Sequence, residues 1–456
     1  MSNAPFVLID DARPGGRALL FEGAVEFVAA RLPEEVQPAL DALRAAASRG
    51  LHAAGFLSYE AGFALEPRLA PLATPSEECE PPLLWFGLFG PPPRIADAAS
   101  FLPDAAGAWS GRVHPLSERS AYEAAVAQVQ EHIAAGDVYQ ANLSFAAALP
   151  VAGSPLSLYA AIRPRARGGH GALVFTGEHW LLSFSPELFF TLEGGTLTSR
   201  PMKGTAARRG ADAEEAEALR ADPKQRAENL MIVDLIRNDL SRVSQPGSVK
   251  VPELFAVETY PTVHQMTSTV TSRLEQGLDA IDVLRALFPC GSITGAPKIR
   301  AMELIAGIER RRRGPYTGAI GRLAPDGDAE FNVAIRTLVL QSGASAASLG
   351  LGAGIVADSK AGDEWLECLA KGAFLKDEDR SFDLIETMRF DPREGLAEIE
   401  RHLARMKASA DRFGFAFDRH GARNELQAAT FGRRRPATAR LLLSPSGAMA
   451  IEVTSA

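Results

Sequence analysis

A run of short strand-like segments between residues 138 and 199 constrains the fold more than any other feature of the chain. With glycine-containing turns between them, the segments are Val138–Ala148, Ala172–Thr176, Trp180–Ser183, Leu188–Leu192 and Thr196–Ser199. Helical patterns follow at residues 213–243, 278–287 and 297–311; strands resume at 318–322, 331–340 and 349–356; and a last helix covers 362–374. Because strands and helices occur in runs without strict alternation, we predict an α+β architecture.

The earlier part of the chain has a weaker pattern. We expect a helix over residues 34–49, a strand over 56–60 and an irregular connection from Pro91 to about residue 117. Ser120 and Glu123 have the spacing of a capping box, which predicts a helix that begins there and ends at Gly136.

Length and composition exclude several classes of protein. The 456 residues are too many for one ordinary core, and the net charge of −8 argues against nucleic-acid binding. No apolar run is long enough to span a bilayer, and the first residues lack the pattern of a secretory signal. Three widely spaced cysteines form neither a disulfide framework nor a zinc pattern, so we expect a cytoplasmic protein. A charged link at residues 376–380 marks a domain boundary, and we divide the chain into 1–117, 118–376 and 377–456.

Two short motifs carry residues suited to chemistry. Arg200–Thr205 reads Arg-Pro-Met-Lys-Gly-Thr, which places Lys203 on a backbone restricted by proline and freed by glycine. Upstream stands Ser185-Pro186-Glu187. Taken alone, Lys203 would be interpreted as a solvated loop lysine.

Further motifs supply carboxylates and a helix start. Glu364 and Glu367 are three residues apart on a predicted helix and share a face, which by spacing alone is usually a solvated surface. Gly291–Lys298 is a glycine-rich turn that leads into a helix, whose free N–H groups suit an anion.

Together these motifs resemble the chorismate-utilising enzymes, a family that includes anthranilate, aminodeoxychorismate and isochorismate synthases. The resemblance covers residues 120–375 well and residues 1–110 loosely. It implies an anthranilate synthase-like chorismate-binding fold, in which large antiparallel sheets pack together with helices outside.

The resemblance also implies a Mg²⁺ site and a substrate site. Ala227–Asp239 and Gly354–Glu367 match the family's carboxylate motifs, so Glu228 and Glu367 would bind Mg²⁺, with Glu364 as a weaker candidate; residues 360–362 depart from the family pattern. The residues expected to bind chorismate are Gln140, Thr294, Gly295, Tyr316, Arg336, Gly352 and Gly354. His264 matches an active-site histidine, although a hydrogen-bonded core histidine is the competing interpretation.

The expected chemistry depends on three residues. By resemblance, Glu187 protonates the C4 hydroxyl of chorismate, and Lys203, as a neutral amine, adds at C2. Lysine at this place is typical of aminodeoxychorismate synthase component I, whereas anthranilate synthases carry alanine. Gln140 stands where isochorismate synthases carry a lysine that activates water, so it favours amination.

We therefore expect a transferase that makes 4-amino-4-deoxychorismate for para-aminobenzoate and folate synthesis. Its ammonia would come from a separate class I glutamine amidotransferase. Anthranilate synthase component I is the alternative enzyme, and a non-catalytic subunit is the alternative of another class.

Residues 382–389 and 400–409 resemble the start of aminodeoxychorismate lyase, a pyridoxal-phosphate enzyme of fold type IV. Arg405 matches a phosphate-binding arginine of that family, although an amphipathic helix with basic residues would look similar. The sequence reaches Ala456 without the lysine that would bind the cofactor covalently, so we expect a small α+β fragment without lyase activity.

Overall fold

The computed structural model describes residues 4–208, 210–260, 263–375 and 382–455. The chain forms two compact units: Met1–Trp109 with His114–Phe374, and Ser110–Val113 with Leu375–Ala456. Among the described residues, the first two predicted divisions thus fall in the same unit, apart from residues 110–113 and Leu375. The predicted boundary at 376/377 lies outside the described residues.

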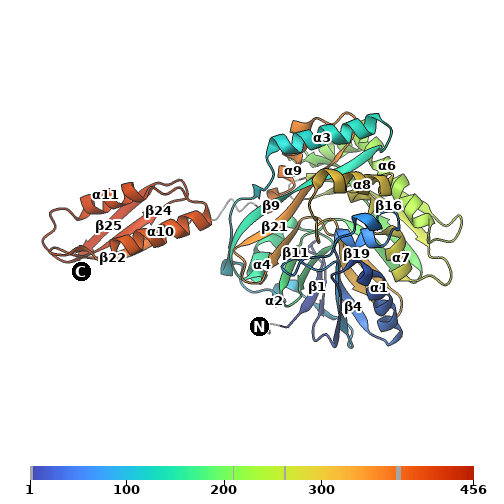
Figure 1. The fold of residues 1–456 in the computed structure, drawn as a ribbon, viewed down its shortest axis with the longest axis horizontal. Coiled ribbons are helices and arrows are strands. Elements are labelled where there is room, and N and C mark those ends of the chain that lie inside the picture. The colour runs from blue at the N-terminus through green and yellow to red at the C-terminus, as the bar shows by residue number, and fades with distance from the viewer. Residues whose placement is uncertain (1–3, 209, 261–262, 376–381, 456) are drawn as a thin grey trace. The chain divides into compact units, whose positions relative to one another are not determined.

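The first unit contains two large sheets (Figure 1). The first sheet has the order β17-β9-β21-β20-β11-β10-β1-β2-β6, with antiparallel neighbours throughout. In that order its strands are Gly295–Ala296, Gln140–Gly153, Ala346–Ile355, Thr337–Gln341, His179–Ser183, Gly171–Phe175, Phe6–Asp10, Ala18–Phe21 and Arg94–Ala96. Two short strands, β7 (Ala108–Ser110) and β8 (His114–Pro115), precede helix α3.

The second sheet has the order β14-β16-β13-β12-β19-β18-β4-β5-β3, again antiparallel, and β15 also pairs with β16. In that order its strands are Met202–Ala207, Val263–Arg273, Thr196–Arg200, Leu188–Glu193, Ala329–Val333, Ala319–Leu323, His52–Leu57, Leu84–Phe89 and Glu26–Ala30; β15 is Lys250–Thr259.

Helices lie on the outside of the two sheets, as the resemblance predicts (Figure 1). Their bounds are α1 Pro33–Ser48, α2 Ala98–Phe101, α3 Arg119–Ala134, α4 Pro155–Ala166, α5 Asp212–Ala221, α6 Pro223–Ser241, α7 Ala280–Leu287, α8 Lys298–Glu309 and α9 Ala361–Ala370. Short 3-10 turns include η1 (Tyr59–Ala64) and η4 (Gly291–Ile293).

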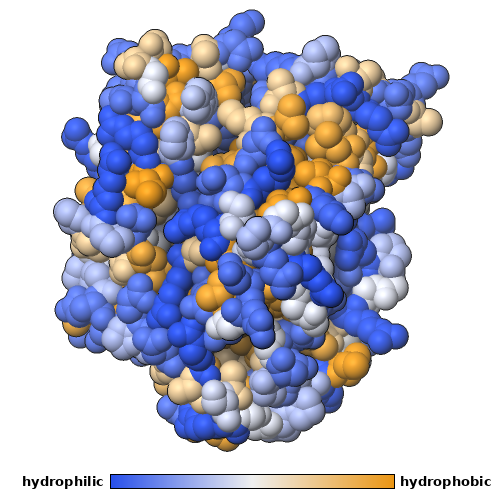
Figure 2. Space-filling view, turned by 90° about the vertical axis from the view of Figure 1, so that its right-hand side faces the viewer, coloured by the Kyte–Doolittle hydropathy of each residue, from blue (hydrophilic) through white to orange (hydrophobic). Residues whose placement is uncertain are grey.

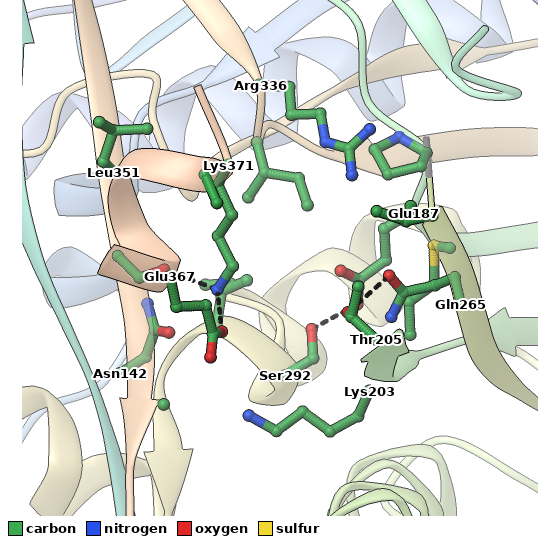
Figure 3. Close-up of a pocket in the computed structure, with 18 of the residues that line it drawn as sticks. Asn142, Glu187, Lys203, Thr205, Gln265, Ser292, Arg336, Leu351, Glu367 and Lys371 are labelled. Atoms are coloured by element: carbon green, nitrogen blue, oxygen red, sulfur yellow. Dashed lines mark hydrogen bonds and ion pairs between the residues drawn. The ribbon is translucent and has the colours of Figure 1, made fainter. Parts of the chain in front are cut away.

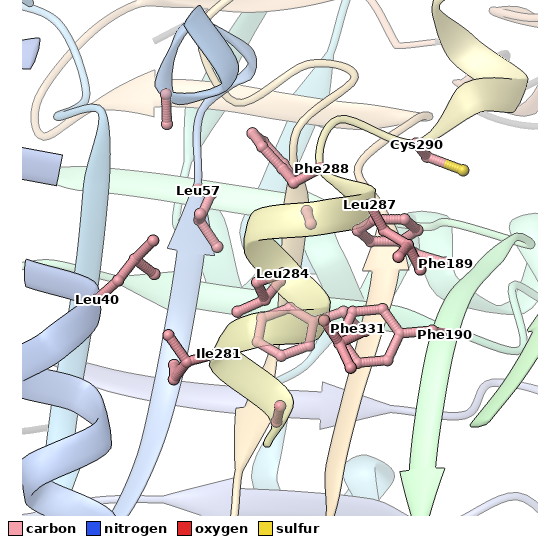
Figure 4. Packing of buried hydrophobic residues seen from close by; sticks show 14 of the residues in the cluster. Leu40, Leu57, Phe189, Phe190, Ile281, Leu284, Leu287, Phe288, Cys290 and Phe331 are labelled. Carbon is pink, nitrogen blue, oxygen red and sulfur yellow. The ribbon is translucent and has the colours of Figure 1, made fainter. Parts of the chain in front are cut away.

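Helix α7 shows how the helices cover the second sheet. Ile281, Leu284 and Leu287 repeat at helical spacing and join Phe190 and Phe331 in one buried cluster (Figure 4). Burying such large side chains contributes about 1.5–3 kcal/mol each to folding. This cluster supports the strands that lead to Glu187 and Arg336.

Several elements differ from the prediction. The helix expected over 213–243 is two helices, because Asp222 accepts hydrogen bonds from Lys224 N and Gln225 N and so caps α6 directly before Pro223. The strand expected over 331–340 is also two strands, and they belong to different sheets, because Arg336 has a φ of 50° and turns the chain. Strands β15 and β16 were not predicted.

The prediction of a capping box at Ser120 is wrong. Helix α3 begins at Arg119, its N-cap Glu118 makes no side-chain cap, and Glu123 binds Arg119 Nε at 2.7 Å instead. The helix does end just before Gly136, which has a φ of 79°.

The second unit is a small α+β arrangement. Its sheet has the order β23-β22-β24-β25, formed by Gly395–Leu396, Leu384–Asp391, Ala437–Leu443 and Met449–Ser455. Helices α10 (Ile399–Phe413) and α11 (Arg419–Thr430) pack on it through buried residues such as Leu403 and Leu426.

Within the described residues, the helices are all too short or too polar to cross a membrane. The face drawn in Figure 2 has hydrophobic patches interrupted by hydrophilic side chains.

Candidate active site

A cavity of about 440 Å³ opens where the two sheets come together (Figure 3). Its volume is in the range of small-molecule sites. Nine of the residues expected in the site line it: Glu187, Lys203, Glu228, Tyr316, Arg336, Gly352, Gly354, Glu364 and Glu367. The structure thus brings together motifs that are up to 180 residues apart in the sequence.

Lys203 extends from strand β14 into this cavity (Figure 3). Its Nζ lies 3.4 Å from Oε2 of Glu228 on helix α6. The lysine backbone is fixed as well, because its carbonyl accepts a hydrogen bond from Nδ2 of the buried Asn229 at 3.0 Å. Gly204 has a φ of 105°, which a residue with a side chain rarely adopts.

Glu187 is buried next to strand β14, directly before strand β12 of the same sheet. Its side chain accepts a hydrogen bond from Ser292 Oγ at 2.6 Å, and Ser292 belongs to the turn η4 (Figure 3). Burial raises the pKa of Glu187 to about 7, although the Ser292 hydrogen bond opposes this shift. A carboxyl group with such a pKa can donate a proton near neutral pH.

Three further glutamates face the cavity from two helices, Glu228 from α6 and the other two from α9. Burial and the neighbouring Glu367 charge raise the pKa of Glu364. Burial also acts to raise the pKa of Glu367, but the Lys371 ammonium outweighs it, so that pKa is lowered. Lys371 Nζ lies 2.9 Å from Glu367 Oε1 and donates to Gly352 O at 2.8 Å.

This donor set fits Mg²⁺. The ion prefers oxygen ligands and needs only one or two protein carboxylates, because it keeps several waters. In the present arrangement, the Lys203 amine stands beside Glu228 and the Lys371 amine beside Glu367.

The opposite end of the cavity is suited to a carboxylate. The Arg336 guanidinium points into it, and burial lowers the pKa of this arginine (Figure 3). Tyr316 lies against strand β21, where a Cβ on Gly350 would come within 2.1 Å of the tyrosine ring. Glycine at that position therefore makes room for the Tyr316 side chain.

Gln140 lies beside the lysine amine, although it does not line the cavity. Its side chain is fully buried, and in the described part of the chain neither amide atom has a hydrogen-bond partner. A Cβ on Gly354 would meet Lys203 Nζ at 2.7 Å and Gln140 Nε2 at 3.0 Å, so both nitrogens approach that glycine. A buried amide without partners is costly, which makes it a candidate to bind a small polar molecule.

Thr294, Gly295 and His264 lie outside the cavity lining. Thr294 Oγ1 bonds to the carbonyls of Cys290 and Gly291, and Gly295 pairs with Ala141 in the first sheet. The turn contributes Ser292 and Ile293 to the cavity in their place.

His264 faces away because side chains alternate along strand β16. Its neighbour Gln265 lines the cavity, accepts a hydrogen bond from Thr205 Oγ1 at 2.9 Å and donates one to Gly204 O at 2.8 Å (Figure 3). The Nε2 atom of His264 instead lies 3.2 Å from Glu215 of helix α5.

Sequence reasoning missed Ser292, Gln265 and Lys371. Ser292 stood inside a motif already singled out, and Lys371 follows Glu367 by four residues, a spacing that brings helical side chains together. Gln265 had no such signal, because its facing depends on how β16 pairs.

In the second unit, Arg405 binds the carboxylate of Glu386, with its Nε 2.6 Å from Oε1. His402 Nδ1 lies 2.7 Å from the other oxygen of Glu386. The phosphate-binding role expected for Arg405 stays a prediction.

A family model described as chorismate binding enzyme matches residues 5–377. The chain belongs to this family. It is 44% identical over 256 residues to an aminodeoxychorismate synthase component 1 from Klebsiella aerogenes, and the matched stretch covers 56% of each chain. It is 45% identical over 252 residues to an anthranilate synthase component 1 from Streptomyces coelicolor, covering 54% of this chain and 48% of that one. The chain thus matches about half the length of these curated relatives.

Solved structures show the same fold. Anthranilate synthase component I from Streptococcus pneumoniae superposes with a TM-score of 0.68 at 26% identity, covering 82% of this chain and 93% of that one. An isochorismate synthase from Bacillus anthracis has a TM-score of 0.64 at 22% identity, with 82% and 96% covered.

Proposed function

We propose that this chain is an aminodeoxychorismate synthase component I, which converts chorismate and ammonia to 4-amino-4-deoxychorismate. The observation that carries the proposal is the Lys203 amine inside the cavity, beside Glu228 and a Gln140 amide that has no hydrogen-bond partner among the described residues. An anthranilate synthase needs no amine at this position.

In the proposed reaction, Arg336 and Tyr316 bind one carboxylate of chorismate, with the arginine able to form two parallel hydrogen bonds. Glu228 and Glu367, with Glu364 nearby, would hold Mg²⁺. When bound, that ion neutralises and orients the ring carboxylate of the substrate.

Glu187 then donates its proton to the C4 hydroxyl, which leaves as water. The neutral Lys203 amine forms a bond to C2 while the ring double bonds shift and the C4–O bond breaks. Ammonia next attacks C4, the double bonds shift back, and the C2–N bond to Lys203 breaks. Lys203 leaves as the neutral amine, and the new C4 ammonium gives one proton back to the Glu187 carboxylate, so the net change is hydroxyl replaced by amine with release of water.

Gln140 would hold the incoming ammonia, because its buried amide offers both a donor and an acceptor and cannot act as a base toward water. We propose that the ammonia comes from a class I glutamine amidotransferase partner, that free ammonium can replace it, and that the reaction serves folate synthesis in the cytoplasm.

Anthranilate synthase component I is the second candidate, because the Streptomyces coelicolor relative is as similar as the first. The two reactions give different products from the same substrates. Incubation with chorismate, Mg²⁺ and ammonium, followed by mass analysis, should give aminodeoxychorismate; anthranilate with pyruvate as the main product would reject the proposal.

The nucleophile has its own test. Wild type given chorismate without ammonium should carry a chorismate-derived adduct that maps to Lys203 in intact-protein and peptide mass spectra. Lys203→Ala should lose the adduct and most aminodeoxychorismate formation. Lys224→Ala is the matched control, since this lysine also lines the cavity but pairs with Asp358 instead. Absence of the adduct together with product formation by Lys203→Ala at a comparable rate would exclude covalent catalysis.

A further inference from the structure

A second group of metal-ligating side chains lies behind the cavity wall, on the other face of strand β16. Nε2 of the fully buried His264 lies 3.2 Å from Glu215 Oε2 and 3.7 Å from Asp212 Oδ1. One ligand atom from each of these residues lies within 4.8 Å of the other two. Asp212 and Glu215 are three residues apart in the first turn of α5, so both carboxylates face the histidine.

The histidine ring is held in one orientation. Its other nitrogen, Nδ1, lies 3.1 Å from Thr259 Oγ1 on the neighbouring strand β15, where Thr259 is paired with His264. Histidines that bind metals are usually oriented by such a contact at the second nitrogen. The Thr259 contact therefore leaves Nε2 directed at helix α5.

We propose that Asp212, Glu215 and His264 form a binding site for a divalent transition-metal ion, with Zn²⁺ the best match. Tetrahedral Zn²⁺ with bonds of about 2.0–2.2 Å to nitrogen and oxygen places its ligand atoms about 3.3–3.6 Å apart. The two distances from Nε2 come close to that separation without a change of backbone. Three protein ligands leave the fourth position to water.

The chemistry of the group separates it from the magnesium site proposed for the cavity. Imidazole nitrogen suits Zn²⁺ and its neighbours, whereas Mg²⁺ prefers oxygen donors alone. The competing interpretation is a histidine–carboxylate ion pair that needs no metal.

Arg208 supplies a way to distinguish the two. Its Nε and Nη2 each donate to the Asp212 carboxylate at 2.7 Å. This guanidinium competes with a metal for Asp212, so its removal strengthens metal binding. In a purely ionic cluster, the same change only removes a partner of Asp212.

The ion would link helix α5 to the strands that carry the reactive lysine. In the pairing of β14 with β16, Ala206 lies opposite His264 and Thr205 opposite Gln265, and Lys203 stands two residues before Thr205. Metal binding on one face would thus stabilise the strand pair that forms the cavity wall on the other.

The test is a zinc titration of the full-length chain, first stripped with a chelator, in competition with a chromophoric chelator and with excess Mg²⁺ present. We expect one Zn²⁺ per chain that Mg²⁺ does not displace. His264→Gln and Glu215→Gln should each weaken binding by about 100-fold or more, Thr259→Val by about 10-fold, and Arg208→Gln should tighten it several-fold. Glu228→Gln, in the cavity, should leave zinc affinity unchanged.

Co²⁺ substitution gives a second measurement, since a four-coordinate site would add visible absorption that Glu215→Gln abolishes. Zinc affinity equal in wild type and Glu215→Gln would overturn the proposal, and so would the absence of binding by wild type at micromolar zinc. Glu215 is only partly buried, so its variant remains informative if His264→Gln fails to fold.

Discussion

The two walls of the cavity hold their glutamates in opposite ways. On one wall Glu187 is 4% exposed and bonded to the neutral Ser292 hydroxyl, and burial raises its pKa to about 7. On the other wall the Glu367 side chain is 55% exposed and paired with Lys371, which lowers its pKa. The same residue type is thus prepared as a proton donor on one side and as an anion for a cation on the other, because burial and the partner's charge differ.

The largest expected effect comes from removing the acid. Glu187→Gln keeps a hydrogen-bonding group beside Ser292 but carries no transferable proton, so kcat with ammonium should fall by about 10²–10⁴-fold. Glu193→Gln, which changes an exposed glutamate at the end of the strand that follows Glu187, is the control and should keep wild-type kcat. A loss smaller than tenfold in a folded Glu187→Gln would mean that the buried wall does not supply the proton.

On the exposed wall, substitution of a glutamate should weaken the binding of Mg²⁺. Glu367→Gln removes a negative oxygen donor, and we expect the Mg²⁺ concentration for half-maximal rate to rise by at least about 10-fold. Glu228→Gln should do the same. Unchanged Mg²⁺ dependence in either variant would remove that residue from the proposed ligands.

A smaller effect should follow from Ser292→Ala. The serine hydrogen bond favours the charged form of Glu187, so its loss raises the pKa of this acid further. Activity requires the protonated acid and declines as pH rises through that pKa. The alkaline limb of the kcat profile should therefore move upward by about one pH unit, which corresponds to one charge-assisted hydrogen bond. A downward shift would contradict the assignment of Glu187 as the acid.

The smallest expected effect belongs to Lys371→Met. Without the ammonium, the pKa of Glu367 rises, and the acid limb of the Mg²⁺-dependent rate should move to higher pH. Because the ion pair is half exposed and screened by water, we expect a shift of less than about 0.7 pH unit. The profile is best measured at low salt and again at high salt, where the difference from wild type should shrink. A shift as large as that of Ser292→Ala would mean that the two walls are equally desolvated.

Much of the fold could be predicted from local patterns. The α+β class, helix α1, helix α9 and strands such as β18 and β21 appear close to their predicted ranges, because side-chain periodicity and turn residues specify them within the segment itself. The motifs also named nine of the residues that line the cavity.

Local patterns could not predict which side chains of a strand face the cavity, or the path of the chain between the sheets. Whether His264 or Gln265 faces the cavity depends on how β16 pairs with β14. A shift of the pairing register by one residue would exchange the two faces of the strand.

The sequence by itself determined which residue types were present for acid, nucleophile and metal chemistry, since these are covalent properties of the chain. The tertiary structure decided their environments. Arg336 enters the cavity because the chain crosses there from one sheet to the other. Strand β19, before it, pairs with β12, and strand β20, after it, pairs with β11. Glu187 has its raised pKa because the packing around it excludes water, and the Ser292 hydroxyl that η4 brings against it limits that rise. Those contacts join segments about a hundred residues apart, so only the packing of the whole unit could establish them.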